Sequence, residues 1–389
     1  MTRVRDDVGS FEDIAAAAVR TTGLCDFGVG VGVGVGVDGV GDHEEGLRIL
    51  LDDLNSPVAG LTGEGNYLQR AQVKSALVGR LLSEFGFAQN PSYSSVKVER
   101  PLFVVGLPRT GTTALHRLLA ADDQAQGLEL WLTEFPQPRP PRETWAENPV
   151  FNGIQAAYAD HHVANPEFMG IHYMDAASVE ECWRLLRQAG MSISYESLAH
   201  VPTYSAWLAE QDWTIAYERH LANLQLIGLN DPEKRWVLKN PSHLVALDAI
   251  MKVYPDALIV RLHRDPVVSI ASACSLSAEA TAGWSTTFVG ETIGRTQLDM
   301  LSRSHAAFEG ARPSYEAAQF VDVEYSDFVA DPVATTRGIY AAFGLDWTEQ
   351  VADTVSQIDA ESRRGGRRPS HSYSLEDYGL TEADVRAAF

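Results

Sequence analysis

Short apolar runs alternate with amphipathic stretches along most of this chain. Four runs have the length and composition of buried strands, at residues 101–106, 235–239, 257–264 and 319–325. The first three are followed by stretches with the apolar spacing of helices, at residues 112–122, 242–254 and 265–277. Strands that alternate with helices predict an α/β fold, in which a parallel sheet is flanked by helices on both faces.

The first 90 residues predict helices around a low-complexity tract. Ser10 precedes apolar residues at helical spacing, which predicts a helix that this serine caps and that ends near Gly23. Strict Gly-Val alternation from Gly28 to Asp42 contains the letters GxGxxG. No preceding strand or following helix start supports a dinucleotide site, so we interpret the tract as a flexible connector. Residues 44–89 predict two more helices.

Residues 127–230 are rich in Trp, Tyr and His and mostly helical in pattern. Ligands of parallel sheets bind beyond the carboxyl ends of the strands. We therefore interpret this segment as a helical cap over that edge of the sheet. The chain then divides into residues 1–44, an N-terminal helix with the Gly-Val tract, and residues 45–389, a single domain that contains the cap.

Composition limits the classes of function. The chain is 45% hydrophobic and 21% charged, as in globular proteins, and no run approaches about 20 apolar residues, so we expect a cytoplasmic protein without a membrane span. A net charge of -21 opposes nucleic acid and anionic membranes, so any anion site must be locally basic. Cys25, Cys182 and Cys274 lack CxxC spacing and predict reduced structural thiols rather than disulfides or a zinc site.

The segment GLPRTGTT, residues 106–113, joins the first predicted strand to its helix. In a Walker A loop, GxxxxGK[ST], backbone N–H groups hold phosphate oxygens, the Lys reaches the β and γ phosphates, and the hydroxyl ligates magnesium. Here Gly106 and Gly111 keep the glycine spacing, Thr112 stands in place of the Lys, and Arg109 supplies the only cation. The loop predicts an anion site without magnesium-triphosphate chemistry.

The motif PRTGTT resembles the 5′-phosphosulfate loop of sulfotransferases that use PAPS (3′-phosphoadenosine 5′-phosphosulfate). It is closest to the PR[ST]GTT form of the tyrosylprotein and bacterial branches. The resemblance implies a P-loop-like sheet with the helical cap inserted after the loop, on the acceptor side. It also implies that PAPS is bound without a metal, by loop residues Arg109, Thr110, Gly111, Thr112 and Thr113.

A second motif strengthens the resemblance. In RLHRDPVVSIAS, Arg264 ends the third strand and Ser272 lies eight residues on, inside the next helix. In sulfotransferases an Arg and a Ser at this spacing bind the 3′-phosphate of PAPS. The arrangement is physically sensible, because Arg offers a bidentate fork and a Ser on the second helical turn can point back at the same anion. The likeness runs from about residue 45 to residue 389.

Two further cofactor contacts are implied only by the resemblance. The Tyr of the VEYSDF segment lies near the adenine in relatives, which implies this role for Tyr325. The tail SRRGGRRPSHSYS is similar to a cationic Arg-Lys-Gly segment that closes on the 3′-phosphate, which implies contacts from Arg363, Arg364 and Gly365. Since the order here is Arg-Arg-Gly-Gly, the arginine that reaches the ligand stays open, and a solvated loop is an equal alternative.

Transfer of a sulfuryl group needs a cation near its oxygens and a base near the acceptor proton. Lys239 and His243, in VLKNPSHL after the second strand, are candidates for these roles, since a His with a pKa near ~6.5 suits proton abstraction. The alternative is that Lys239 pairs with a carboxylate and His243 caps a helix. Glu129, twenty residues beyond Arg109, and His172 from the cap are further candidates for the base.

Glu180 and Glu181 have a local explanation. Ser178 to Glu181 has the spacing of a capping box, so we expect both carboxylates to stabilise the start of a helix.

The acceptor is the least determined part of the prediction. The cap holds five tryptophans that can line an apolar pocket, although most are expected in the core: Trp131, Trp145, Trp183, Trp207 and Trp213. We expect a small phenolic, steroid-like or lipid alcohol. Two alternatives stay open, a divergent P-loop kinase and a non-catalytic protein that binds adenosine 3′,5′-bisphosphate. The oligomeric state is open as well.

Overall fold

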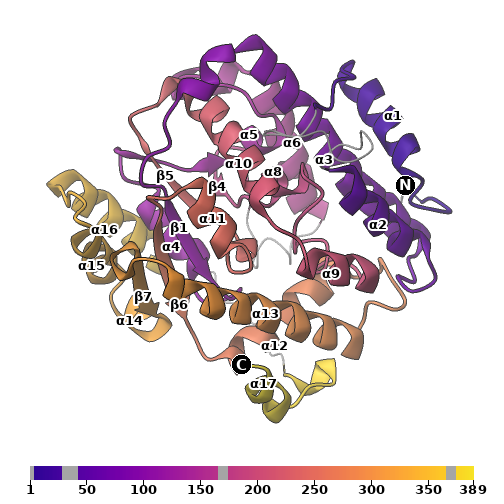
Figure 1. Ribbon diagram of the computed structural model, residues 1–389. Helices are drawn as coiled ribbons and strands as arrows, with labels where there is room; N and C mark the ends of the chain where they lie inside the picture. Colours follow the sequence, from indigo (N-terminus) through magenta and orange to yellow (C-terminus); the bar gives the residue numbers. More distant parts are fainter. Residues whose placement is uncertain (1–3, 29–42, 165–173, 365–373) are drawn as a thin grey trace.

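The computed structural model describes residues 4–28, 43–164, 174–364 and 374–389 (Figure 1). At its centre lies a parallel five-stranded sheet with the strand order β2-β5-β1-β6-β7. These strands are β1 (Leu102–Gly106), β2 (Ala125–Gln126), β5 (Arg235–Lys239), β6 (Leu258–His263) and β7 (Phe320–Glu324). A short antiparallel pair, β3 (Leu128–Glu129) with β4 (Val179–Glu180), lies outside this sheet.

Helices surround the sheet on both faces, as Figure 1 shows. In chain order the α-helices are α1 (Phe11–Thr22), α2 (Glu44–Asn55), α3 (Gly63–Gln89), α4 (Thr112–Leu119), α5 (Leu130–Glu134), α6 (Pro149–Ala164), α8 (Trp183–Arg187), α9 (Pro202–Ala209), α10 (Thr214–Ile227), α11 (Leu247–Val253), α12 (Pro266–Ala280), α13 (Glu291–Ala311), α14 (Tyr325–Ala330), α15 (Pro332–Phe343), α16 (Glu349–Arg364) and α17 (Glu382–Ala388). Single 3₁₀ turns lie at Pro91–Ser95, Arg142–Glu147, Gly228–Asn230, Pro241–His243, Arg312–Ser314, Ala317–Gln319 and Glu376–Tyr378.

Successive residues of β1 point to opposite faces of the sheet, so their side chains belong to two different apolar cores. Leu102 and Val104 pack with apolar residues of α4, α15 and α16. Phe103 and Val105 belong to the larger core on the other face, which also contains residues of the N-terminal helices, of residues 127–230 and of α11 to α13. The cap and the N-terminal helices therefore share one apolar core with the sheet.

The α/β prediction is confirmed, because each of the four predicted runs contains a strand. Local signals at the N-terminus also hold: Ser10 Oγ accepts from the backbone N–H of Asp13 at 3.2 Å, and Gly23 ends α1 with φ 72°. Most of the Gly-Val tract, at residues 29–42, lies outside the described residues. No helix within the described ranges is long and apolar enough to cross a membrane.

Parallel pairing brings the carboxyl ends of four strands to one edge of the sheet. Val104 is the register partner of Lys239, Gly106 that of Leu262, and the last residues of β6 and β7 pair as well. The segments that leave β1, β5, β6 and β7 therefore meet at this edge, where ligands of such sheets bind.

Buried histidines lie beneath this edge. His116 Nε2 donates to the carbonyl of Val237 at 3.1 Å, and His220 Nδ1 lies 2.8 Å from the hydroxyl of Tyr254. Burial lowers the pKa of His116 to about 4 and that of His220 to about 3. Both rings are therefore neutral in the folded protein near neutral pH.

These histidines predict an acid-sensitive fold. Below pH ~6.5 the unfolded chain binds protons at these positions and the folded chain does not, so the free energy of unfolding falls as the pH falls. Each histidine contributes about 1.4 kcal/mol per pH unit between its unfolded and folded pKa. Chemical denaturation of His220→Gln between pH 7 and pH 4.5 should show a decline that is shallower by this amount.

Tyr254→Phe is the matched control, since it removes the partner hydroxyl but no group that titrates in this range. It should lower stability at every pH and keep the wild-type slope. Equal slopes in the wild type and His220→Gln would contradict the assignment.

Candidate functional site

The loop between β1 and α4 turns sharply through residues 106–111. Gly106, Arg109 and Gly111 have φ values of 152°, 70° and 89°. A Cβ on Gly106 would lie 2.8 Å from the carbonyl oxygen of Leu262, and one on Gly111 would lie 3.3 Å from the ring of Tyr325. The buried Thr110 hydroxyl ties the loop by donating to the carbonyl of Leu107 at 2.8 Å. The loop leads directly into the N-terminus of α4, which has no side-chain cap among the described residues, and the free backbone N–H groups of a helix start favour an anion.

The two predicted arginines meet at this loop. Arg264 Nη1 donates to the backbone carbonyl of Arg109 at 2.7 Å, and the Arg264 guanidinium carbon lies 4.2 Å from the ring centre of Tyr325. Arg109 Nε in turn donates to Ser272 Oγ at 3.2 Å. The structure thus brings Arg109, Arg264, Ser272 and Tyr325 into one connected group.

Neither arginine of this group has a carboxylate within ion-pair distance in the described parts of the chain. Many other arginines of the described chain do form ion pairs with carboxylates, as expected in a protein of net charge -21. Two guanidinium groups left without a counter-charge beside backbone N–H donors form a site for an anion with more than one charged group.

Lys239, at the end of β5, faces the same loop. Its Nζ lies 3.0 Å from Thr113 Oγ1 and pairs with the carboxylate of Glu181. Asn240 Nδ2 also donates to Glu181, at 3.3 Å, and the backbone N–H of Cys182 donates to the carbonyl of Lys239 at 3.1 Å. The alternative for Lys239, a carboxylate partner, is thus observed, and the same lysine contacts Thr113 of the loop.

The capping box proposed for residues 178–181 is wrong. Val179 and Glu180 form β4, and α8 begins only at Trp183. Ser178 Oγ instead donates to Asp175 Oδ2 at 2.7 Å. Pairing of β4 with β3 fixes this segment as a strand, and this non-local contact overrides the local helix signal. Glu181 pairs instead with Lys239, so the residue that the sequence interpretation set aside as a helix cap becomes a functional candidate.

Glu129 lies in a separate ion pair. Its Oε2 accepts from Arg139 Nε at 3.0 Å, and Arg139 also donates to the carbonyl of Gly127 at 2.7 Å and pairs with Asp231 at 3.3 Å. Arg139 stacks on Trp236, near the start of β5. These contacts give Glu129 a structural role, with Arg139 rather than Lys239 as its partner.

His243 lies in the core rather than at the edge of the sheet. Its Nδ1 lies 2.6 Å from the hydroxyl of Tyr217, and its ring contacts Phe103 edge-on at 5.0 Å. Burial lowers its pKa well below the ordinary value of 6.5. It caps no helix, since Asn240 is the residue that caps the 3₁₀ turn Pro241–His243.

The remaining predicted residues lie near or outside the limits of the described chain. His172 and Gly365 are outside the described residues, and Arg364 is the last residue of α16. Arg363 Nε donates to Asp359 on its own helix at 2.8 Å.

Of the five cap tryptophans, Trp131, Trp145 and Trp213 are buried in the core, as expected.

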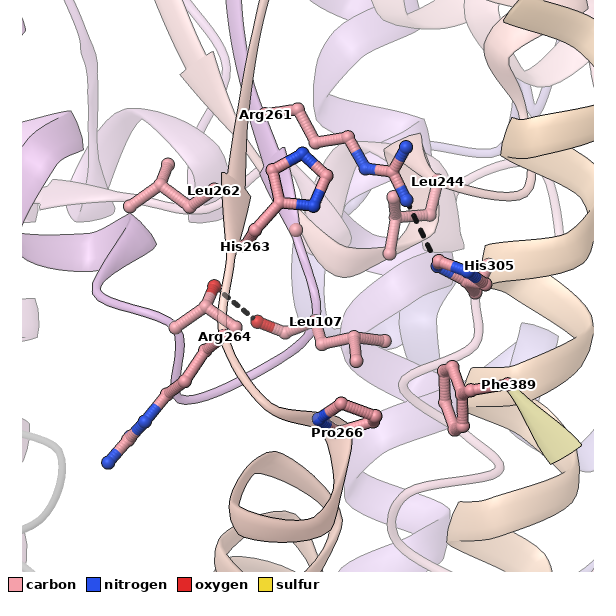
Figure 2. A pocket seen from close by; sticks show the side chains of 11 residues that line it. Leu107, Leu244, Arg261, Leu262, His263, Arg264, Pro266, His305 and Phe389 are labelled. Atoms are coloured by element: carbon pink, nitrogen blue, oxygen red, sulfur yellow. Dashed lines mark hydrogen bonds between the residues drawn. The ribbon is translucent and has the colours of Figure 1, made fainter. Parts of the chain in front are cut away.

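A cavity of about 220 Å³ lies behind the loop, on the α13 side of β6. Figure 2 shows Arg261 and His305 bonded across it, at 3.0 Å, and the side chain of Arg264 extending away from them. Arg261 also pairs with Glu309. Arg264 and the loop residues Gly106 and Thr110 also line this cavity, which therefore adjoins the anion site, while Arg261 is held by its own partners.

Comparisons with known proteins agree with this geometry. A model described as "Sulfotransferase family" matches residues 101–349. The crystal structure of sulfotransferase STF1 from Mycobacterium tuberculosis H37Rv is 49% identical, with 99% of both chains covered and a TM-score of 0.90. That of STF9 from Mycobacterium avium is 27% identical over 99% of this chain and 96% of the other, with a TM-score of 0.86.

A curated relative is the omega-hydroxy-beta-dihydromenaquinone-9 sulfotransferase Stf3 of Mycobacterium bovis, at 24% identity over 261 residues. The match spans 64% of this chain and 64% of the length of that relative.

Two glycine replacements, one in the loop and one in α15, should have opposite effects on the stability of the protein. Gly106→Ala adds a Cβ at positive φ against the Leu262 carbonyl and should destabilise the protein by roughly 1–3 kcal/mol. Gly338→Ala, in α15, meets no atom within 4 Å and should stabilise it by about 0.4–1 kcal/mol. Chemical denaturation measures both, and a harmless Gly106→Ala would show that the loop does not require this conformation.

Proposed function

The chain belongs to the sulfotransferase family, and we propose that it transfers a sulfuryl group from PAPS to a hydroxyl or amine of a small acceptor. PAPS supplies this group: its sulfur loses the bond to the bridging oxygen and gains one to the acceptor atom, and adenosine 3′,5′-bisphosphate is released. The chain must hold the donor at both phosphates, stabilise negative charge at the sulfuryl group and take up the acceptor proton.

The observation that carries this proposal is the convergence of Arg109 and Arg264 on a lysine-less loop, with no carboxylate paired to either in the described residues. Arg109, the loop N–H groups and the first turn of α4 are suited to the 5′-phosphosulfate. Arg264 and Ser272 are suited to the 3′-phosphate, and the ring of Tyr325, stacked on Arg264, to the adenine.

Lys239 and Glu181 supply the remaining chemistry. Lys239 touches Thr113 and Glu181 at once, so it carries positive charge to the sulfuryl oxygens while it holds the carboxylate in place. Glu181 is the carboxylate that contacts the loop through this lysine, and its side chain is 17% exposed. We assign the general base to Glu181, because its partner Lys239 contacts Thr113 of the loop, whereas Glu129 pairs with Arg139 and His243 is enclosed by the core.

An apolar alcohol fits the acceptor side best. The net charge of -21 disfavours a polyanionic glycan. The name of the curated relative from Mycobacterium bovis describes an omega-hydroxy menaquinone derivative. This name supports a hydroxyl on an apolar molecule as the first class of acceptor to test.

Turnover tests the proposal. The protein is incubated with PAPS and a panel of phenols, alkyl alcohols and amines, and release of adenosine 3′,5′-bisphosphate is followed by chromatography. Acceptor-dependent release is expected. Tight binding of adenosine 3′,5′-bisphosphate with no release across the panel would instead favour a non-catalytic binding protein.

The base assignment predicts a kinetic split. With the best acceptor and saturating PAPS, Glu181→Gln should lower kcat by about a hundredfold or more, because no other carboxylate replaces it, and should keep the affinity for adenosine 3′,5′-bisphosphate. Glu129→Gln is the matched control. It should retain kcat and lower the melting temperature, because it breaks a buried ion pair. An unchanged kcat in Glu181→Gln would remove this residue from the mechanism.

A further inference from the structure

Arg264 contacts the loop backbone as well as the space assigned to the 3′-phosphate. Its Nη1 donates to the carbonyl oxygen of Arg109 at 2.7 Å, across 155 positions of the chain. Arg264 follows β6 directly, and β6 pairs with β1 along its whole length. The contact therefore joins the end of one strand to the loop that leaves its neighbour.

The carbonyl that Arg264 binds belongs to a residue in an unfavourable backbone conformation. Arg109 has φ 70°, in the left-handed region that non-glycine residues rarely adopt, and this costs of order 1 kcal/mol or more. Such a conformation persists only where surrounding contacts hold it. A charge-assisted hydrogen bond to this carbonyl is a contact of that kind.

The remaining donors of Arg264 point to a second task. A guanidinium has five N–H donors, and in the described residues the carbonyl of Arg109 takes only one of them. The group is half-buried and held over the ring of Tyr325 at 4.2 Å. Its fixed fork can therefore serve the carbonyl and a phosphate together.

The hydrogen bonds of Arg264, Arg109 and Ser272 form a closed cycle with the chain segment that joins Arg264 to Ser272. Arg109 Nε donates to Ser272, Ser272 lies on α12, and α12 begins two residues after Arg264. A phosphate bound by Arg264 and Ser272 therefore acts on both ends of Arg109, its backbone through Arg264 and its side chain through Ser272.

We propose that Arg264 is a positioning residue for the 5′-phosphosulfate loop, in addition to its role at the 3′-phosphate, so that the two phosphate subsites are coupled. The inference rests on the proposed function, because it takes the two subsites from that assignment. It implies that loss of Arg264 weakens the binding even of nucleotides that have no 3′-phosphate.

Adenosine 5′-phosphosulfate, which lacks the 3′-phosphate, is the decisive probe. Its affinity is measured by competition against adenosine 3′,5′-bisphosphate, in the wild type, Arg264→Met, Arg264→Lys, Ser272→Ala and Arg386→Met. Arg386→Met is a charge-matched control, since Arg386 lies on α17, and its partners are Asp265 and Glu382. Adenosine serves as the reference for contacts made by the base alone.

Both Arg264 variants should lower the affinity for adenosine 5′-phosphosulfate roughly tenfold, which is the effect expected from the loss of one charge-assisted hydrogen bond. Ser272→Ala should weaken the binding of adenosine 3′,5′-bisphosphate more than that of adenosine 5′-phosphosulfate, because Ser272 also accepts from Arg109, and Arg386→Met should weaken neither. Arg264→Lys keeps the charge but cannot serve two partners with one fork, so it decides the matter if Arg264→Met does not fold.

Two outcomes would overturn the coupling. Affinity for adenosine 5′-phosphosulfate that is unchanged in the Arg264 variants, or lowered only as much as that of adenosine, would limit Arg264 to the 3′-phosphate and leave the proposed function intact. A wild-type protein that binds neither phosphorylated nucleotide would remove the proposed function and this inference together.

Discussion

The proposed site depends on one constraint, the sharp backbone turn of residues 106–111, in a loop that has no lysine. Three positions of this stretch have positive φ, and only two of them are glycine. Gly106 lies too close to the Leu262 carbonyl for any side chain, whereas Arg109 is held by a hydrogen bond from Arg264. In the proposed site, arginines from two different segments supply the positive charge that a Walker A lysine provides elsewhere.

The sheet makes this replacement possible. Parallel pairing of β5, β1, β6 and β7 brings Lys239, the loop, Arg264 and Tyr325 to one edge, although they are far apart in the sequence. Repulsion by the overall charge of -21 weakens the binding of polyanions in general. Any anion that binds must therefore be held by the small group of cations at this edge. Cap, N-terminal helices and sheet share one core, which fixes the position of Glu181 relative to Lys239.

The local parts of this design could be predicted from the sequence. The strands, the Ser10 cap of α1 and the lysine-less loop all follow from signals within a few residues. Contacts between distant segments were not readable in this way. From the sequence, Glu181 is assigned to a helix start, because β3, which pairs with the neighbouring β4, lies about fifty residues earlier. The motif around His243 suggested a base, yet nothing in it reveals that Tyr217 and Phe103 enclose the ring.

Calorimetric titration of the protein with adenosine 3′,5′-bisphosphate, and separately with ATP and magnesium, tests the central claim most directly. The account predicts binding of the bisphosphate in the micromolar range or tighter and no binding of ATP with magnesium, because we assign Arg264 and Ser272 to a 3′-phosphate and the loop has no lysine for a γ phosphate. Binding of ATP with magnesium and none of the bisphosphate would mean that the loop serves a nucleoside triphosphate, and would contradict the account.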